Sequence, residues 1–197
     1  MPSEKVKILQ LPFPKYQGYR PDVVRLINVR SFDACASNAM RCRILGLIAQ
    51  GVNSAADIAK QLNMGRTAVY RHLNALEKHG WIVHTNNKFF IAAKLFLAFD
   101  MVLDPEGKIV IQVMPDRGAF VDETVGLILV KGPQCHCEVC VLFQRCLRAV
   151  KELARKLDVK IRSETPLAAF KEIVETLVKR DVVTLVKKGY LVVKSGD

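Results

Sequence analysis

The chain has 197 residues, of which 50 % are hydrophobic and 25 % charged, and its 30 lysines and arginines against 19 acidic residues give a net charge of +11. This composition predicts a globular protein of one large or two small domains, and the surplus of positive charge favours a polyanionic partner over a membrane surface. No apolar run reaches the ~18 residues that a membrane-spanning helix needs, and the N-terminus lacks the long apolar core of a signal peptide. We therefore expect a cytoplasmic protein without a membrane partner.

The first 36 residues are interrupted by residues that break long elements, namely Pro12, Pro14, Gly18 and Pro21. Residues 23–32 are apolar and β-branched enough for a strand, or for a short helix packed on the domain that follows. Ser37 or Asn38 is placed to cap the next helix, which begins the domain. Cys35 and Cys42 flank this cap, and we interpret both as core residues.

Residues 54–80 predict two helices separated by a tight turn. Ser54 can cap the first helix, with Asp57 three residues later in a weak version of the capping box. Gly65 lies where the second helix begins, and Gly80 follows its last turn as a stop signal. The second helix has one apolar side, because Val69, Leu73 and Leu76 recur at i, i+4 and i+7.

A different face of the same helix carries only hydrogen-bonding groups, which are those of Thr67, Tyr70, Arg71 and Asn74. A hydroxyl, a phenol, a guanidinium and an amide on one stripe suit the major groove of DNA, where base edges offer donors and acceptors and phosphates attract arginine. Two short apolar segments follow at residues 81–85 and 88–93. The Asn86-Asn87 pair between them predicts a hairpin turn, since asparagine tolerates positive φ.

This arrangement resembles the winged-helix transcription regulators of the ArsR/MarR type, over roughly residues 37–95. Residues 62–73 are similar to that family's recognition-helix segment, residues 41–51 to its first helix, and residues 81–94 to its wing. The resemblance implies a second helix in the major groove, a hairpin tip at the neighbouring backbone or minor groove, and a homodimer. By position, the implied DNA-contacting residues are Arg66, Thr67, Tyr70, Arg71 and Asn74, with Asn86, Asn87 and Lys88 at the wing tip. The family often has Ser or Thr where this chain has Gly65 and Tyr70.

Beyond Lys94 the pattern changes. Residues 95–104 and 108–114 flank the turn signal Pro105-Glu106-Gly107, which predicts a hairpin, or a helix end followed by a strand. Residues 120–132 end in an apolar run that fits a buried strand or a helix.

A cysteine cluster follows, with four of the six cysteines of the chain within twelve positions: Cys135, Cys137, Cys140 and Cys146. Thiolates are ligands for zinc and for iron–sulfur clusters, and the spacing C-x-C-x2-C-x5-C predicts one of these two occupants without deciding between them. His136 is an alternate ligand. A redox thiol switch and simply buried cysteines are the competing interpretations.

The rest of the chain predicts a helix near residues 146–157 and a second helix that begins at Thr165-Pro166. Residues 181–194 predict a terminal hairpin. Because residues 76–94 and 177–194 share a helix end, a strand, a basic turn and a strand, residues 147–197 are either a second winged-helix-like unit or an ordinary helix with a hairpin.

Together these features predict an α+β protein with a winged helix-turn-helix DNA-binding domain at residues 1–95 and a smaller α+β domain at residues 96–197. We expect a homodimeric, non-enzymatic transcription regulator of double-stranded DNA, in which metal or redox state at the cysteines alters the dimer. The alternatives are an RNA-binding or protein-interaction winged-helix protein with a structural zinc site.

Overall fold

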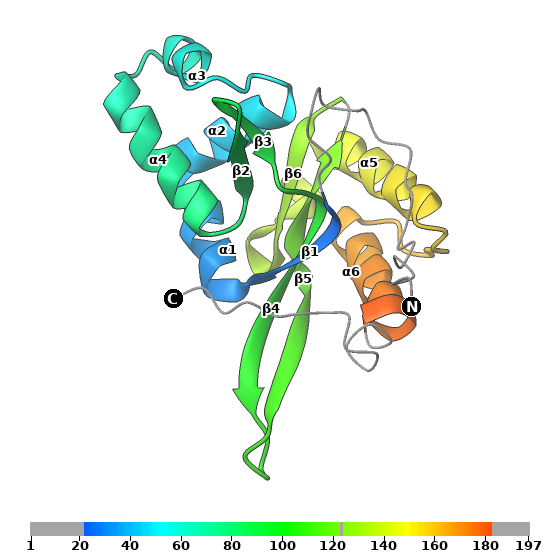
Figure 1. The fold of residues 1–197 in the computed structure, drawn as a ribbon. Coiled ribbons are helices and arrows are strands. Elements are labelled where there is room, and N and C mark those ends of the chain that lie inside the picture. Colours follow the sequence, from blue (N-terminus) through cyan, green and yellow to red (C-terminus); the bar gives the residue numbers. More distant parts are fainter. Residues whose placement is uncertain (1–21, 123, 183–197) are drawn as a thin grey trace, which may run out of the picture.

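The computed structural model describes residues 22–122 and 124–182. Four helices and a two-stranded wing lie on one face of a four-stranded sheet, and two helices cover the other face (Figure 1). The fold is therefore α+β, as predicted. The elements are β1 (Asp22–Asn28), α1 (Val29–Ala36), α2 (Ala39–Ala49), α3 (Ala55–Leu62), α4 (Arg66–Lys78), β2 (Ile82–Thr85), β3 (Lys88–Ile91), β4 (Ala93–Leu103), β5 (Ile109–Asp122), β6 (Gly126–Lys131), α5 (Phe143–Lys156) and α6 (Pro166–Leu177).

The local signals in the sequence are confirmed. The side chain of Asn38 accepts a hydrogen bond from the Arg41 amide and caps α2, and the Ser54 hydroxyl accepts one from the Asp57 amide and caps α3. The wing turn has φ 49° at Asn86 and 57° at Asn87. These features were predictable because each depends on a few neighbouring residues.

The sheet has the strand order β1-β4-β5-β6, in which β1 pairs parallel with β4 and the other pairs are antiparallel. Residues 23–32 thus form both a strand and a helix, residues 95–114 form the predicted hairpin, and the apolar run after residue 120 is strand β6. The expected domain boundary at residues 95/96 falls inside β4. Strands from both expected domains therefore share one sheet, joined by pairing between residues more than 60 positions apart.

Each face of the sheet carries its own core. The first core lies under α1–α4 and the wing, and the second lies under α5 and α6. Strand β4 contributes to both, since Phe96 and Ala98 belong to the first core and Leu95 and Leu97 to the second. Trp81 is fully buried in the first core, with ring centroids 5.5 Å from Phe32 and 4.9 Å from Phe96.

Helix α6 lies very close to the sheet at Gly118. A Cβ atom at Gly118 would lie 2.5 Å from the Phe96 carbonyl oxygen and 2.8 Å from the Phe170 ring, so only glycine fits there. The rings of Phe120 and Phe170 stack beside this point, with centroids 5.9 Å apart.

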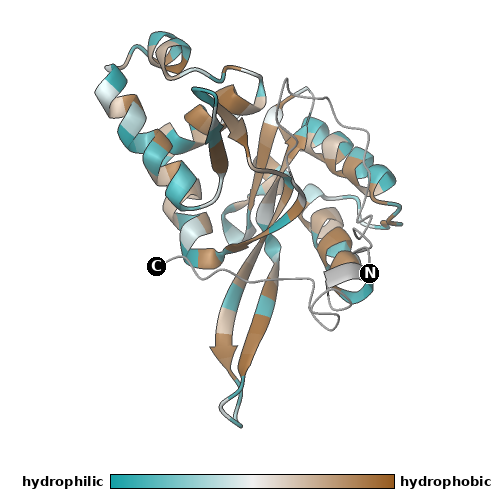
Figure 2. Ribbon diagram, viewed as in Figure 1, coloured by the Kyte–Doolittle hydropathy of each residue, from teal (hydrophilic) through white to brown (hydrophobic). Residues whose placement is uncertain are grey.

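The end of the β4–β5 hairpin projects beyond the rest of the molecule (Figure 1), and its strands are strongly apolar (Figure 2). The exposed large apolar residues there are Met101, Val102, Leu103, Ile109 and Val110. Beyond the pair Asn28–Phe99, β4 has no neighbour on its outer edge within the described residues. Strand β6 pairs with β5 only from Arg117 onward.

Helices α5 and α6 confirm the helices predicted after the cysteines, and Pro166 opens α6 as expected. The predicted terminal hairpin lies outside the described residues, and so do residues 1–21. Within the described ranges, no helix combines the length and apolar character needed to cross a membrane.

Candidate nucleic-acid interface and cysteine cluster

Helix α4 has the two faces that its sequence predicts. Val69, Leu73 and Leu76 are completely buried and hold the helix on the first core. The five predicted DNA-contacting side chains of this helix are all exposed to solvent: Arg66, Thr67, Tyr70, Arg71 and Asn74. The described C-terminal helices, α5 and α6, lie on the opposite side of the sheet and leave this face open (Figure 1).

The N-terminus of α4 is also open. Gly65 is the N-cap, with φ −66° and ψ 142°, and no side chain caps the helix there. The Ala68 amide donates to the Gly65 carbonyl at 3.0 Å, so the amides of Arg66 and Thr67 are the ones of the first turn that remain available, and the helix dipole favours a phosphate beside them.

The wing is fixed to the helix-turn-helix by two contacts. The Phe89 amide donates a 2.8 Å hydrogen bond to the carbonyl of Asn53, just before α3. The Tyr70 ring meets the edge of Phe89, with centroids 6.3 Å apart. Tyr70 thus supports the wing as well as facing solvent, which the sequence did not predict. Asn86, Asn87 and Lys88 are exposed at the wing tip.

The histidines of the helix-turn-helix and wing contact neighbouring side chains of the protein. The Nδ1 atom of His79 lies 3.1 Å from the Ser31 hydroxyl, and the His84 ring stacks on Phe89. Partial burial, followed by the nearby charges of Arg41 and Arg71, lowers the pKa of His72. His72 is therefore neutral at pH 7, and the positive charge of this surface comes from arginine and lysine.

The cysteine cluster lies on two short 3-10 turns after β6 and on the first turn of α5. Cys140 is exposed and the other three thiols are half-buried. Burial, and then the proximity of Cys137, Cys135 and Cys140, raises the pKa of Cys146 to about 11. Burial likewise raises the pKa of Cys135. The raised pKa keeps the thiols of Cys135 and Cys146 neutral, and the four cysteines lie close enough to influence one another electrostatically.

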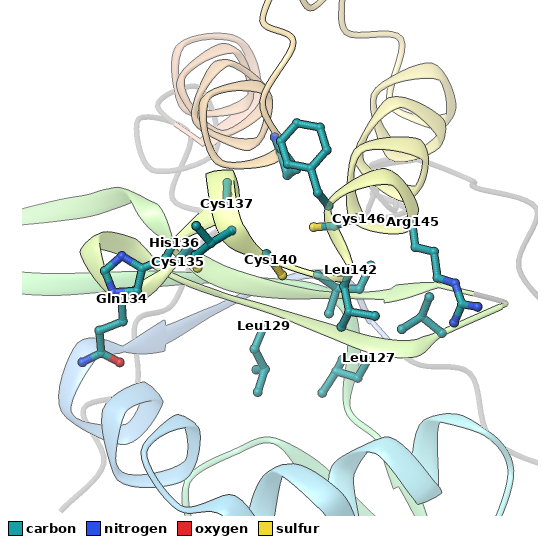
Figure 3. Close-up of a pocket in the computed structure, with 15 residues that line it drawn as sticks. Leu127, Leu129, Gln134, Cys135, His136, Cys137, Cys140, Leu142, Arg145 and Cys146 are labelled. Atoms are coloured by element: carbon teal, nitrogen blue, oxygen red, sulfur yellow. The ribbon is translucent and has the colours of Figure 1, made fainter.

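All four cysteines line one cavity of about 470 Å³ between β6 and α5 (Figure 3). The rest of its wall is mostly apolar, including Leu127, Leu129, Leu142 and Phe143. The His136 ring also borders it but points away from Cys140 and Cys146 (Figure 3). Among the described residues, no three Cys, His, Asp or Glu side chains converge closely enough to hold a single metal ion. The metal ligands therefore remain a prediction.

Lys131 connects this cluster to the helix-turn-helix side of the sheet. Its amide donates to the Cys135 sulfur at 3.1 Å, and its ammonium group donates to the carbonyl of Ala36 at the end of α1. No motif in the sequence pointed to this residue, because the contact spans 95 positions.

Comparison with known proteins agrees with the local geometry. Residues 39–82 match the family described as bacterial regulatory protein, arsR family. No curated protein and no solved structure matches the chain. The matched residues run from the start of α2 to the first residue of β2, and so include both helices of the motif, but neither the rest of the wing nor the cysteines. Residues 39–82 are thus similar to the helix-turn-helix unit of the ArsR family, with α4 in the position of its second helix.

Proposed function

We propose that the protein is a transcription regulator that binds duplex DNA with α4 in the major groove. The observation that carries this proposal is the solvent-exposed polar face of α4 in a segment that matches the ArsR-type helix-turn-helix. Arg71, Asn74 and Thr67 supply donors and acceptors for base edges. Arg66 and the free amides after Gly65 suit phosphates, and Lys88 at the wing tip suits the adjacent backbone. This is a binding function rather than an enzymatic one, exercised in the cytoplasm.

The test is selection of a preferred duplex from a random pool, followed by titration against that duplex and a structured RNA at matched salt. We expect tighter binding of the duplex, with a log–log salt slope of about −0.9 for each phosphate contacted. Equal or tighter binding of the RNA would favour the RNA-binding alternative. If neither nucleic acid binds, the winged helix acts as a protein-interaction module.

We also propose that two copies associate through the projecting β4–β5 hairpin. Leu103 and Ile109 face each other across the two strands and are each 71 % exposed. Met101 and Ile111 extend the same face, which makes a continuous apolar strip on a ribbon whose outer edges pair with no other described strand. An exposed apolar strip is unfavourable in water, and the same strip on a second copy, related by a twofold axis, would cover it.

The double substitution Leu103→Lys with Ile109→Lys is expected to convert a dimer of twice the 22.1 kDa chain mass into a monomer, because two buried charges would face each other. Light scattering after gel filtration at micromolar concentration measures this mass. Val102→Lys with Val110→Lys is the matched control, since this pair lies on the other face of the same hairpin. A monomeric wild-type protein, or equal disruption by the control pair, would argue against the apolar strip as the interface.

The cysteine cluster is proposed to regulate DNA binding through the metal or redox state of its thiols. Lys131 supplies a physical connection, because it bonds both the Cys135 sulfur and the end of α1, which packs beside α2. A small change in dimer geometry alters the spacing of two recognition helices, which must match the ~34 Å repeat of DNA. In the duplex titration above, adding chelator or oxidant should change affinity at least about fivefold. An unchanged affinity would leave the cluster with a structural role.

A further inference from the structure

We infer that the space between β6 and α5 binds a small amphipathic anion, with an apolar chain in the cysteine-lined cavity and a phosphate head group on the arginines of α5. The cavity, of about 470 Å³, has the size of pockets that hold small organic ligands. The inference goes beyond the proposed regulator, and it depends neither on DNA binding nor on the metal or redox state of the thiols.

The cavity offers an apolar chain an almost continuous apolar wall. Apolar residues of β6 line one side of it, and Leu142 and Phe143 at the start of α5 line another. Burial raises the pKa of the Cys135 and Cys146 thiols, so these two side chains add neutral, weakly polar surface. Val139 also lines the cavity and is 82 % exposed. A chain of methylene groups that covered this wall would remove its apolar surface from water.

A second hollow, of about 680 Å³, adjoins the cavity, because Val125 and Arg145 line both. Gln134 and Arg145 lie at opposite ends of the cavity, so the hollow continues from the Arg145 end (Figure 3). An apolar chain in the cavity would therefore place its head group in the hollow. The charged side chains of the hollow are mostly cationic, namely Arg145, Arg148, Lys151, Arg155 and Lys156 against Asp122 and Glu152.

Two of these cations have no acidic partner. Glu152, the acidic residue that α5 contributes to the hollow, already pairs with Arg155 and Lys156. Arg145 and Arg148 are exposed and make no ion pair within the described part of the chain. Guanidinium groups bind phosphate oxygens through paired, charge-assisted hydrogen bonds. The hollow therefore has two arginines available for one phosphate group.

The position of Arg145 in α5 also favours a bound anion. The helix begins at Phe143, so Arg145 lies in its first turn, where the helix dipole is positive. No acidic residue occupies that turn, and no side chain caps the helix. The arginine charge and the dipole therefore repel each other, and a phosphate bound beside them would offset this repulsion.

A membrane surface is the other partner that an amphipathic, cationic helix suggests. An interfacial helix must turn its apolar side toward the lipid. That side of α5 is not available, because Val150, Leu153 and Ala154 are buried in the second core. A soluble amphipathic anion therefore fits this site better than a bilayer does.

The experiment is calorimetric titration of the full chain with decyl phosphate, with decanol and inorganic phosphate as probes of each half alone, all below micellar concentrations. We expect decyl phosphate to bind at least about tenfold more tightly than either half. Decanoate should bind more weakly than decyl phosphate, because a carboxylate offers fewer oxygen atoms to the two arginines. No binding of decyl phosphate, equal binding of either half, tighter binding of decanoate, or binding only to anionic lipid vesicles would overturn the inference.

Variants locate the ligand. Arg145→Glu should weaken the binding of decyl phosphate at least about tenfold, because it replaces an attraction with a repulsion. Lys160→Glu is the matched control, since this exposed lysine lines neither hollow. Val139→Asp puts a charge on the apolar wall and should also weaken binding, whereas Val141→Asp, on the same loop but outside both linings, should not. Wild-type affinity in the Arg145 or the Val139 variant, or equal losses in a variant and its control, would overturn the assignment. Duplex binding is measured separately and without ligand, so failure here leaves the DNA-binding proposal standing.

Discussion

Replacing Arg66 and Arg71 together with alanine is expected to weaken binding to the selected duplex by about 100-fold or more. Each arginine contact to a base or phosphate is worth about 1–3 kcal/mol, and both guanidinium groups lie on the exposed face of α4. Neither makes an ion pair within the described part of the chain, so the folded protein should keep its stability. Fluorescence anisotropy at fixed salt measures the affinity, and thermal unfolding checks the fold.

The matched control is Arg148→Ala with Lys160→Ala, which removes the same charge from exposed positions on and beyond α5, across the sheet from α4. If general attraction to a polyanion explained binding, both double variants would lose affinity equally. We expect the control to stay within about threefold of the wild type, a small share of the effect at α4. Equal losses would mean that α4 does not read the duplex.

Trp81→Ala is expected to lower the free energy of unfolding by about 3–5 kcal/mol, the usual cost of emptying a large aromatic site. The Trp81 ring packs on Phe32 of α1 and Phe96 of β4, and its indole N–H donates to the Ser31 carbonyl at 3.3 Å. It therefore joins the helix-turn-helix side to the sheet. Urea unfolding followed by circular dichroism measures the change.

Val141→Ala provides the comparison for that experiment, because Val141 is 97 % exposed on the loop before α5, outside the proposed dimer strip, and its loss removes little buried surface. Its unfolding free energy at submicromolar concentration should stay within about 0.5 kcal/mol of the wild type. One cooperative transition that shifts as a whole in the Trp81 variant would show that the two sides unfold together. Two transitions, of which only one moves, would show that the winged helix unfolds independently.

The sequence predicted those parts of the fold that depend on nearby residues. The caps at Asn38 and Ser54 and the wing turn at Asn86-Asn87 are local, and the two faces of α4 follow from the helical period. The exposure of the polar face that is proposed to contact DNA was therefore predictable residue by residue. The cysteines were visible as a cluster for the same reason, although their spacing could not decide the occupant.

Contacts between distant segments were not predictable. No residue near Leu26 in the sequence indicates that Leu26 pairs with Leu97. The apolar run of β4 indicates only that this strand is buried on both sides. The same holds for the bond from Lys131 to Ala36 and for the packing of Tyr70 on Phe89. Each of these depends on chain segments brought together by the sheet, for which a single sequence carries no periodic signal.

The parallel pairing of β1 with β4 has a consequence for how DNA binding is controlled. Everything from α1 to β3, residues 29–91, is the connection between two adjacent, hydrogen-bonded strands. The helix-turn-helix and wing are thus attached to the sheet at both ends of this segment, and they cannot rotate as a domain on a flexible linker would. A rotation of residues 29–91 therefore rotates the sheet beneath them as well. In the proposed dimer, the angle between the two α4 helices on DNA is then set by how the two sheets pack against each other.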